Sequence, residues 1–94
     1  MAAWLYILRC ADGRYYTGTT RATLEDRLTE HAAGTFDGWT ARRRPHELAY
    51  AQYFENVVDA IAAERQIKRW TRAKKEALIH GDAAELKRLA RGRS

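Results

Sequence analysis

Residues 4–19 read WLYILRCADGRYYTGT, and this stretch decides the fold. Two runs rich in aromatic, aliphatic and β-branched residues, 4–11 and 14–19, lie on either side of Asp12-Gly13. Such runs favour strands, and an Asp-Gly pair between them is a strong signal for a β-hairpin. The sequence therefore predicts that the domain begins with an antiparallel hairpin.

The length of the hairpin loop decides which way Tyr6 and Tyr16 point. A two-residue turn would pair Tyr6 with Thr19 and place the two tyrosines on opposite faces, because side chains alternate along a strand. A three-residue loop with Gly13 in the left-handed conformation forms a bulge and places both tyrosines on one face. We predict the bulged, odd-length loop.

The rest of the chain alternates between capped helices and one more strand. Capping residues precede each predicted helix, and Asp82 with Glu85 has the spacing of a capping box. The expected elements are a helix over 23–33 ended by Gly34, a loop over 35–45, a strand over 47–54, and helices over 56–70, 71–81 and 82–90. The order β-β-α-β-α-α-α predicts an α+β fold, a small three-stranded and mostly antiparallel sheet flanked by helices.

Length and composition indicate a single domain. The chain has 94 residues, 46% of them hydrophobic, which suffices for one modest core. We expect the domain over residues 1–80 and a basic C-terminal helix over 81–94 that packs on it or trails from it. No apolar run is long enough to span a bilayer, and residues 1–8 lack the basic start of a signal peptide. Cys10 is the only cysteine, so we expect a cytoplasmic protein without membrane contact or an internal disulfide.

Positive charge gathers in the last third of the chain. Residues 65–94 carry ten Lys or Arg against three acids, a net charge of +7, whereas residues 1–64 carry seven against nine, a net charge of −2. Such asymmetry favours a polyanionic partner, most often nucleic acid. A solvated basic helix that keeps the protein soluble explains this feature equally well.

Two polar residues interrupt the apolar face of the first helix. Leu24, Arg27, Leu28 and His31 have the spacing i, i+3, i+4, i+7 and therefore share one face. A buried cation without a partner is costly, so an anionic group should lie near Arg27. The alternative is an arginine that extends to solvent beside a histidine satisfied within the core.

A carboxylate occupies the same kind of position on the helix that Asn56 caps. The predicted inward face of that helix comprises Val57, Ala60, Ile61, Ile67 and Trp70. Glu64 lies in the middle of this face, where a carboxylate is paired, protonated or bound to a metal. An ion pair between Arg27 and Glu64 is the simplest structural explanation.

Together these residues resemble the GIY-YIG nuclease superfamily, and most closely its small stand-alone bacterial proteins of the UPF0213 type. The likeness covers about residues 3–80. It is carried by Trp4-Leu5-Tyr6, Tyr16-Thr17-Gly18, Arg27, His31, Arg43-Arg44-Pro45 and the run Glu64-x-x-Ile67-Lys68-x-Trp70-x-Arg72-x-x-Lys75. The first tripeptide lacks the family's glycine, and Thr19 stands where some relatives have a lysine.

The resemblance implies metal-assisted hydrolysis of a DNA phosphodiester. Glu64 would hold one divalent cation, Mg²⁺ or Mn²⁺. Tyr6 would act as general base or position the water, with Tyr16 in a supporting role. Arg27 would clamp the scissile phosphate, and His31 would carry a proton or bind phosphate. Gly13 and Gly18 would have structural roles.

Basic residues around that centre would contact DNA phosphates without reading sequence. They are Arg42, Arg43, Arg44, Lys68, Arg69, Arg72, Lys74 and Lys75. Trp39 would either stack on an exposed base or cover the core. We therefore expect a DNA endonuclease that selects DNA structure or acts nonspecifically, with a role in repair, as a monomer or weak homodimer. A protein partner could supply specificity. The alternatives are a nucleic-acid-binding protein of the same fold with weak or partner-dependent cleavage, and an RNA-directed role.

Overall fold

A three-stranded antiparallel sheet in the order β2-β1-β3 organises the molecule. The structure is a computed structural model and describes residues 1–34 and 38–91. Strand β1 spans Ala3–Cys10, β2 spans Tyr15–Thr20 and β3 spans His46–Phe54. The predicted α+β fold with its three-stranded sheet is confirmed. Parts of the expected loop (35–37) and of the C-terminal segment (92–94) lie outside the described residues.

The helices follow the predicted order, with one addition. They are α1 (Leu24–Ala33), α2 (Gly38–Ala41), α3 (Val57–Lys68), α4 (Arg72–Ile79) and α5 (Ala83–Arg91). Sequence periodicity cannot reveal α2, because four residues are too few to show a helical repeat. Helix α3 ends two residues earlier than predicted, where the Trp70 backbone N–H bonds to the Ile67 carbonyl and tightens the last turn. No helix among the described residues has the length and apolar character needed to cross a membrane.

The predicted caps fix where the helices begin. The side chains of Thr23, Asn56 and Thr71 each accept a hydrogen bond from a backbone N–H in the first turn of the following helix. Only half of the predicted capping box forms. Asp82 accepts from the Glu85 N–H, but the Glu85 carboxylate is held by Arg88, at 2.7 and 2.6 Å. The reciprocal bond fails because the guanidinium fork offers the carboxylate two charge-assisted hydrogen bonds.

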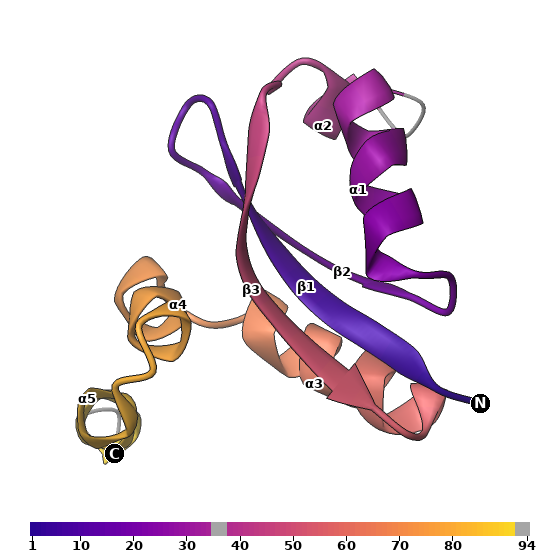
Figure 1. Ribbon diagram of the computed structural model, residues 1–94. Helices are drawn as coiled ribbons and strands as arrows, with labels where there is room; N and C mark the ends of the chain where they lie inside the picture. Colours follow the sequence, from indigo (N-terminus) through magenta and orange to yellow (C-terminus); the bar gives the residue numbers. More distant parts are fainter. Residues whose placement is uncertain (35–37, 92–94) are drawn as a thin grey trace.

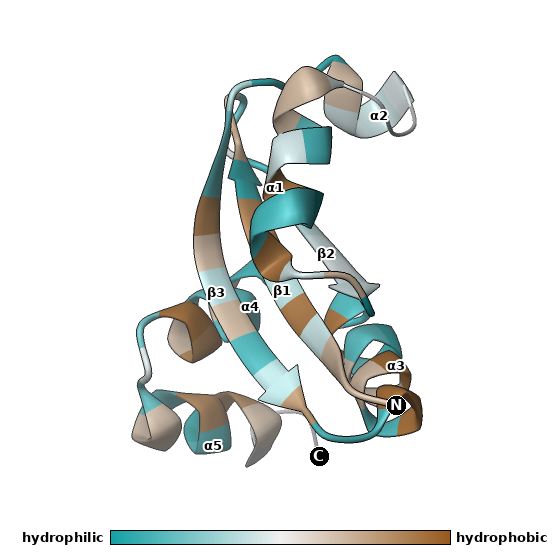
Figure 2. Ribbon diagram, turned by 45° about the vertical axis from the view of Figure 1, so that its right-hand side comes forward, coloured by the Kyte–Doolittle hydropathy of each residue, from teal (hydrophilic) through white to brown (hydrophobic). Residues whose placement is uncertain are grey.

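Helices cover both faces of the sheet (Figure 1). Helix α1 lies over one face, and α3 packs against the other, where Leu5 and Ile7 of β1 meet Ile67. The central strand is therefore buried on both sides, and Leu5, Ile7 and Leu8 are all fully buried. Figure 2 shows the hydrophobic segments of β1 and β3 alternating with polar ones along the strands. Helices α4 and α5 lie side by side beyond the end of α3 (Figure 1).

The hairpin has the three-residue loop that the sequence predicted. Leu8 pairs with Tyr16, and Tyr6 pairs with Gly18. The Cys10 N–H bonds to the Arg14 carbonyl, so residues 11–13 form the loop, and Gly13 has a φ of 85°. This pairing places the side chains of Tyr6 and Tyr16 on the same face of the sheet, the face that α1 covers.

The predicted burial along the inward face of α3 is correct for Ala60 and Ile67 and wrong for Ile61. Ala60 and Ile67 are buried, whereas Ile61 is 38% exposed. Ile61 lines an open pocket with Thr19 and Thr20, at the end of the edge strand β2, where the sheet no longer covers the helix.

A candidate active site around the edge strand

Tyr6 and His31 form a buried pair between the sheet and α1. The Tyr6 hydroxyl lies 2.9 Å from Nε2 of His31, and each residue is only 2% exposed. Tyr6 comes from the middle of β1, and His31 from the apolar stripe of α1 that also carries Leu24, Arg27 and Leu28. The stripe faces the sheet as predicted, with Glu25, Asp26, Thr29 and Glu30 exposed.

Tyr16 completes an aromatic cluster on this face. Its ring lies 6.4 Å from the ring of Tyr6 and 5.3 Å from that of His31, measured between centroids. On its other side Tyr16 contacts Trp39 of α2, at 6.1 Å. Trp39 therefore packs over the two-tyrosine cluster, and Tyr16 lies between it and His31.

Gly18 makes room for the Tyr6 ring. A Cβ atom at Gly18 would lie 2.7 Å from the Tyr6 hydroxyl oxygen and 3.1 Å from the Tyr16 ring. Real carbon atoms do not approach side-chain atoms so closely, so any larger residue would displace both tyrosines. The structural role of Gly18 is therefore to leave space for the side chains of Tyr6 and Tyr16.

Arg27 lies one turn before His31 and is partly buried. Its Nε donates to Oγ1 of Thr20 at 3.2 Å and lies 3.6 Å from a carboxylate oxygen of Glu30. Glu30 is thus an acidic neighbour of the kind expected for Arg27. Because the Glu30 pair is exposed to water on one side, it stabilises the fold little.

Glu64 approaches from the opposite face of the sheet. Its carboxylate accepts a hydrogen bond from Thr19 Oγ1 at 2.8 Å and pairs with Lys68 Nζ at 2.7 Å. Its ion partner is therefore Lys68, and the simple explanation of an Arg27–Glu64 pair is wrong. An Arg27–Glu64 pair would need both residues on one side of the sheet. Glu64 lies instead on the α3 face, opposite to Arg27, because Thr19 and Thr20 are consecutive strand residues and point to opposite sides of β2.

A pocket at the end of β2 joins the two faces. It has a volume of about 340 Å³ and is lined by Thr19, Thr20, Arg21, Arg27, Val57 and Ile61. Because β2 is an edge strand, no further strand separates the side with Arg27 from the side with Glu64. The two threonines hold Arg27 and Glu64 on either side of this edge.

Burial controls the acidity of Tyr6. Desolvation raises the pKa of its phenol far above the ordinary value, and the neighbouring Tyr16 raises it further. The positive charge of Arg27 opposes this shift, whereas Glu64 adds to it. Tyr6 is therefore a neutral phenol at physiological pH, and a free phenolate at this position is strongly disfavoured.

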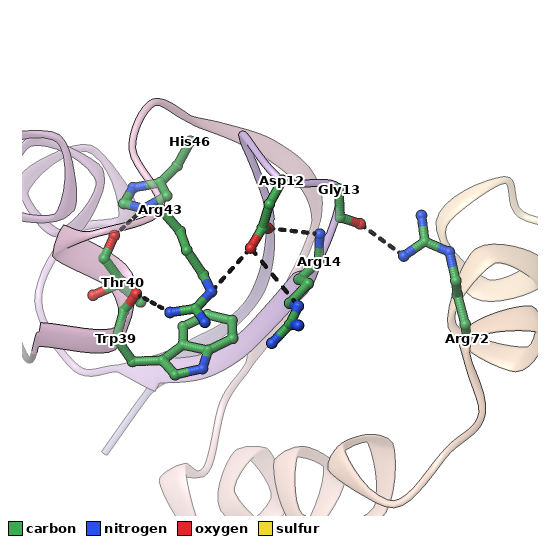
Figure 3. Close-up of polar contacts among 8 residues, drawn as sticks. All are labelled: Asp12, Gly13, Arg14, Trp39, Thr40, Arg43, His46 and Arg72. Atoms are coloured by element: carbon green, nitrogen blue, oxygen red, sulfur yellow. Dashed lines mark hydrogen bonds and ion pairs between the residues drawn. The ribbon is translucent and has the colours of Figure 1, made fainter.

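Several of the predicted DNA-binding cations are tied to the fold. Arg43 binds Asp12 at 3.0 Å and the Trp39 carbonyl at 2.9 Å, with its guanidinium over the Trp39 ring (Figure 3). Arg72 donates to the Gly13 carbonyl at 2.7 Å and so joins α4 to the hairpin loop. Arg44 donates to the carbonyls of Ala41 and Ala32.

The other predicted cations fall into two groups. Lys68 is exposed but bound to Glu64, and burial lowers the pKa of Lys75. Lys74 lies over the ring of Trp70, at 4.7 Å. Arg42 and Arg69 are exposed.

His46 is a neighbour of the site that sequence reasoning missed. Its ring lies 5.9 Å from that of His31, at an interplanar angle of 89°. Its Nε2 bonds to the Thr40 carbonyl at 2.8 Å (Figure 3). His46 comes from the start of β3, far from α1 in the sequence, and no local pattern signals the contact.

The donor set suits a metal held largely by water and substrate. Among the described residues, no group of three His, Cys, Asp or Glu side chains could enclose an ion. The Glu64 side chain is 18% exposed, and it accepts a hydrogen bond from Thr19, which lines the pocket. Mg²⁺ commonly binds one or two carboxylates and completes its shell with waters and phosphate oxygens, so this residue fits that mode and not a closed cage.

The site thus combines a phenol–imidazole pair and an arginine on one face of the sheet with a carboxylate on the other, in a small basic α+β domain. The model of the GIY-YIG catalytic domain matches residues 2–77, and the chain belongs to this family. Membership points to nuclease activity, with DNA as the class of substrate.

Similar proteins support this assignment. The chain is 41% identical to a UPF0213 protein of Bacillus pumilus over 76 residues, covering 81% of this chain and 76% of that protein. A UPF0213 protein of Halobacterium salinarum is 39% identical, with coverage of 80% and 96%. The solution NMR structure of a UPF0213 protein from Bacillus halodurans matches with a TM-score of 0.57, at 34% identity and coverage of 93% and 94%. That of a protein from E. faecalis matches with a TM-score of 0.61, at 37% identity and coverage of 86% and 85%.

Proposed function

We propose that this protein is a divalent-metal-dependent DNA endonuclease. The observation that carries the proposal is the arrangement around β2, where Arg27 and the Tyr6–His31 pair lie on one side and Glu64 on the other. A pocket at the strand edge is lined by Arg27 and by the two threonines that bond Arg27 and Glu64. A protein that only binds nucleic acid has no need of a partly buried carboxylate at this place.

Glu64 would hold the metal ion, Mg²⁺ or Mn²⁺. The bound ion would supply Lewis-acid stabilisation of the phosphate and of the leaving oxygen. Thr19 holds one carboxylate oxygen of Glu64 and so fixes its orientation toward the edge of β2. Lys68 neutralises the other oxygen, and it would move aside when the ion binds.

Arg27 would bind the phosphate that is cut. Its Nε donates to Thr20 Oγ1, and its side chain forms part of the lining of the pocket. A planar fork can bind two phosphate oxygens at once and stabilise the negative charge that develops on them.

The Tyr6–His31 pair would take the proton of the attacking water. The raised pKa of Tyr6 excludes a resident phenolate, so Tyr6 can accept a proton only while it passes its own to His31 Nε2. The water oxygen would form its bond to phosphorus as the bond to the leaving sugar oxygen breaks. The water proton would end on His31 through Tyr6, and the leaving oxygen would be protonated from solvent. Tyr16, between His31 and Trp39, would keep the relay aligned.

The substrate would be recognised by structure or without specificity. The charged groups that line the pocket are two arginines, Arg21 and Arg27, whose guanidinium groups suit phosphate oxygens. Phosphate contacts of this kind position a protein on DNA but carry no sequence information. Such an activity suits DNA repair, with the protein acting alone or with a partner that supplies selectivity.

A second candidate is a DNA-binding protein of the same fold that cleaves weakly or only with a partner. One observation favours it: both oxygens of Glu64 are engaged by Thr19 and Lys68. A metal ion must compete with Lys68 for this carboxylate, which weakens its binding.

A cleavage assay with matched variants separates the two candidates. Purified protein is incubated with plasmid, branched and single-stranded DNA in Mg²⁺, Mn²⁺ or EDTA. The proposal predicts metal-dependent cleavage that Glu64→Gln abolishes and Asp59→Asn leaves intact, because Asp59 is an exposed carboxylate on the same helix. Cleavage that survives EDTA or Glu64→Gln would contradict the enzyme. Metal-independent binding without cleavage, steeply weakened by salt, would instead support the binding protein.

A further inference from the structure

A groove crosses the outer surface of α3, separate from the pocket with Arg27. It has a volume of about 600 Å³ and is lined by Ala62, Arg65, Gln66, Arg69, Trp70 and Lys74. Three of these six residues are cations, and none is acidic. Arg65 takes no part in the catalytic arrangement, and neither the motifs nor the family likeness singled it out.

The cations of the groove are uncompensated, unlike their neighbours. On the same two helices, Lys68 is paired with Glu64, and Arg72 with Glu76. Within residues 1–34 and 38–91, Arg65 and Arg69 form no ion pair and no side-chain hydrogen bond. Lys74 lies over the face of Trp70 and, within the described part of the chain, forms no ion pair with a carboxylate. Uncompensated like charges that face one hollow repel one another, and an anion relieves that repulsion.

The groove continues from the catalytic stripe of α3. Glu64 and Lys68 lie on the side of α3 that faces β2. Arg65 is the residue after Glu64, and Arg69 is the residue after Lys68. Successive helix residues are turned by about 100°, so the two arginines lie side by side on the adjacent, solvent-facing stripe. A chain of phosphates that leaves the pocket at β2 therefore meets Arg65 and Arg69 next.

Helix α5 adds one further cation beside the groove. A second hollow of about 360 Å³ shares Gln66, Trp70 and Lys74 with the groove. The residues that α5 adds to this hollow are Ala83, Leu86, Lys87 and Ala90, of which Lys87 alone is charged.

We propose that this groove binds the phosphodiester backbone of the DNA substrate beyond the scissile phosphate. The inference rests on the proposed function and extends it. It adds Arg65 to the expected phosphate contacts Arg69 and Lys74 and places the three in one substrate-holding groove that takes no part in the chemistry. The bound strand crosses α3 from the pocket at β2 toward the junction of α3 and α4.

The test compares two double variants that lose the same charge. Arg65→Ala/Arg69→Ala removes two groove cations, and Arg9→Ala/Arg14→Ala removes two exposed arginines of the hairpin that do not line the groove. All four side chains are exposed, so both variants should fold, which circular dichroism checks. DNA affinity is measured in EDTA over a range of salt concentrations, and cleavage kinetics are measured with Mg²⁺.

The groove variant should bind DNA at least about tenfold more weakly at physiological salt, with the slope of log K against log salt less steep by about 2. Its KM should rise while kcat at saturating DNA stays unchanged, and the hairpin variant should match the wild type. Equal effects of the two double variants would contradict DNA binding by the groove. The same conclusion would follow if Arg65→Ala/Arg69→Ala kept the DNA affinity and the KM of the wild type. In both cases Glu64-dependent cleavage would leave the proposed function standing. A wild-type protein that binds no DNA would overturn both proposals.

Discussion

The Tyr6 hydroxyl and Nε2 of His31 lie 2.9 Å apart, and both side chains are buried between the sheet and α1. A buried hydroxyl and a buried imidazole nitrogen are each costly without a partner, and here each supplies the other's hydrogen bond. The same contact therefore stabilises the fold and gives Tyr6 the hydrogen-bond partner that the proposed mechanism uses as its proton acceptor. This double role makes the consequences of changing Tyr6 measurable in the absence of any substrate.

The raised pKa of Tyr6 predicts a loss of stability at high pH. The folded phenol keeps its proton when the unfolded phenol, with an ordinary pKa of about 10, has lost it. Because the folded state then binds more protons, the stabilisation is complete below pH 10 and decreases as pH rises further. One such group lowers the free energy of unfolding by at most about 1.4 kcal/mol per pH unit.

Tyr6→Phe isolates this contribution. At neutral pH the variant should be less stable by about 1–3 kcal/mol, because His31 loses its hydrogen-bond partner. Above pH 10 the difference from the wild type should shrink, although the raised pKa values of Tyr15 and Tyr50 act on both proteins. Denaturant unfolding at pH 7, 9.5 and 10.5 measures it. A constant difference at all three pH values would mean that Tyr6 titrates normally.

Gly18→Ala should disrupt the two tyrosines. The added Cβ would lie 2.7 Å from the Tyr6 hydroxyl oxygen and 2.9 Å from its ring carbon Cζ. Overpacking of this kind costs about 1–3 kcal/mol, and the displaced phenols should reduce cleavage strongly. Thermal unfolding and cleavage rates are the measurements.

Gly13→Ala is the informative contrast. Gly13 has a φ of 85° but no atom within 4 Å of an added Cβ. The substitution should cost about 1–2 kcal/mol of backbone strain and leave the cleavage rate of the folded protein nearly unchanged. Comparable losses of activity in Gly13→Ala and Gly18→Ala would show that the crowding at Tyr6 is not what matters.

Thr19→Val should weaken metal binding more than it weakens the fold. The substitution keeps the shape of the side chain but removes the hydroxyl that donates to Glu64. Loss of a partner that orients a metal ligand typically costs 10–100-fold in affinity or activity, so we expect an increase of about tenfold or more in the Mg²⁺ concentration for half-maximal cleavage.

Thr17→Val is the matched control for this change. Thr17 lies on the same face of β2, two residues earlier, and its buried hydroxyl has no hydrogen-bond partner within the described residues. Its Mg²⁺ dependence should equal that of the wild type. A similar shift in both valine variants would point to a general effect on the strand.

Arg27→Lys should reduce cleavage although it conserves the charge. A lysine cannot present two donors in a plane and cannot keep the bond from Nε to Thr20. Loss of one donor to the transition state costs about 100-fold or more in kcat, with a smaller effect on KM. Arg21→Lys serves as the control, because Arg21 lines the same pocket but is exposed. Unchanged kcat in Arg27→Lys would remove Arg27 from the proposed mechanism.

Local sequence determined most of the fold. Thr23 and Gly34 fix both ends of α1, because a capping hydroxyl and a left-handed glycine act within one helical turn. Asp12-Gly13 between two apolar runs determined the hairpin, and the bulged loop followed from glycine's access to positive φ. The sequence also showed that Arg27, His31 and Glu64 are polar residues on otherwise apolar helix faces, because the position of a residue on a helix face depends only on spacing along the chain.

The tertiary structure decided how these residues meet. Thr19 bonds Glu64 on one face of β2, and Thr20 bonds Arg27 on the other. The periodicity of a single helix does not reveal on which side of the sheet that helix packs. His46 reaches His31 only because β3 pairs with β1. The sequence likewise supplied a set of basic residues that could contact DNA but did not show which of them are available for it. Which cations bind carboxylates or carbonyls, and which face an open groove, depends on contacts between residues far apart in the chain, and those exist only once the core has brought the elements together.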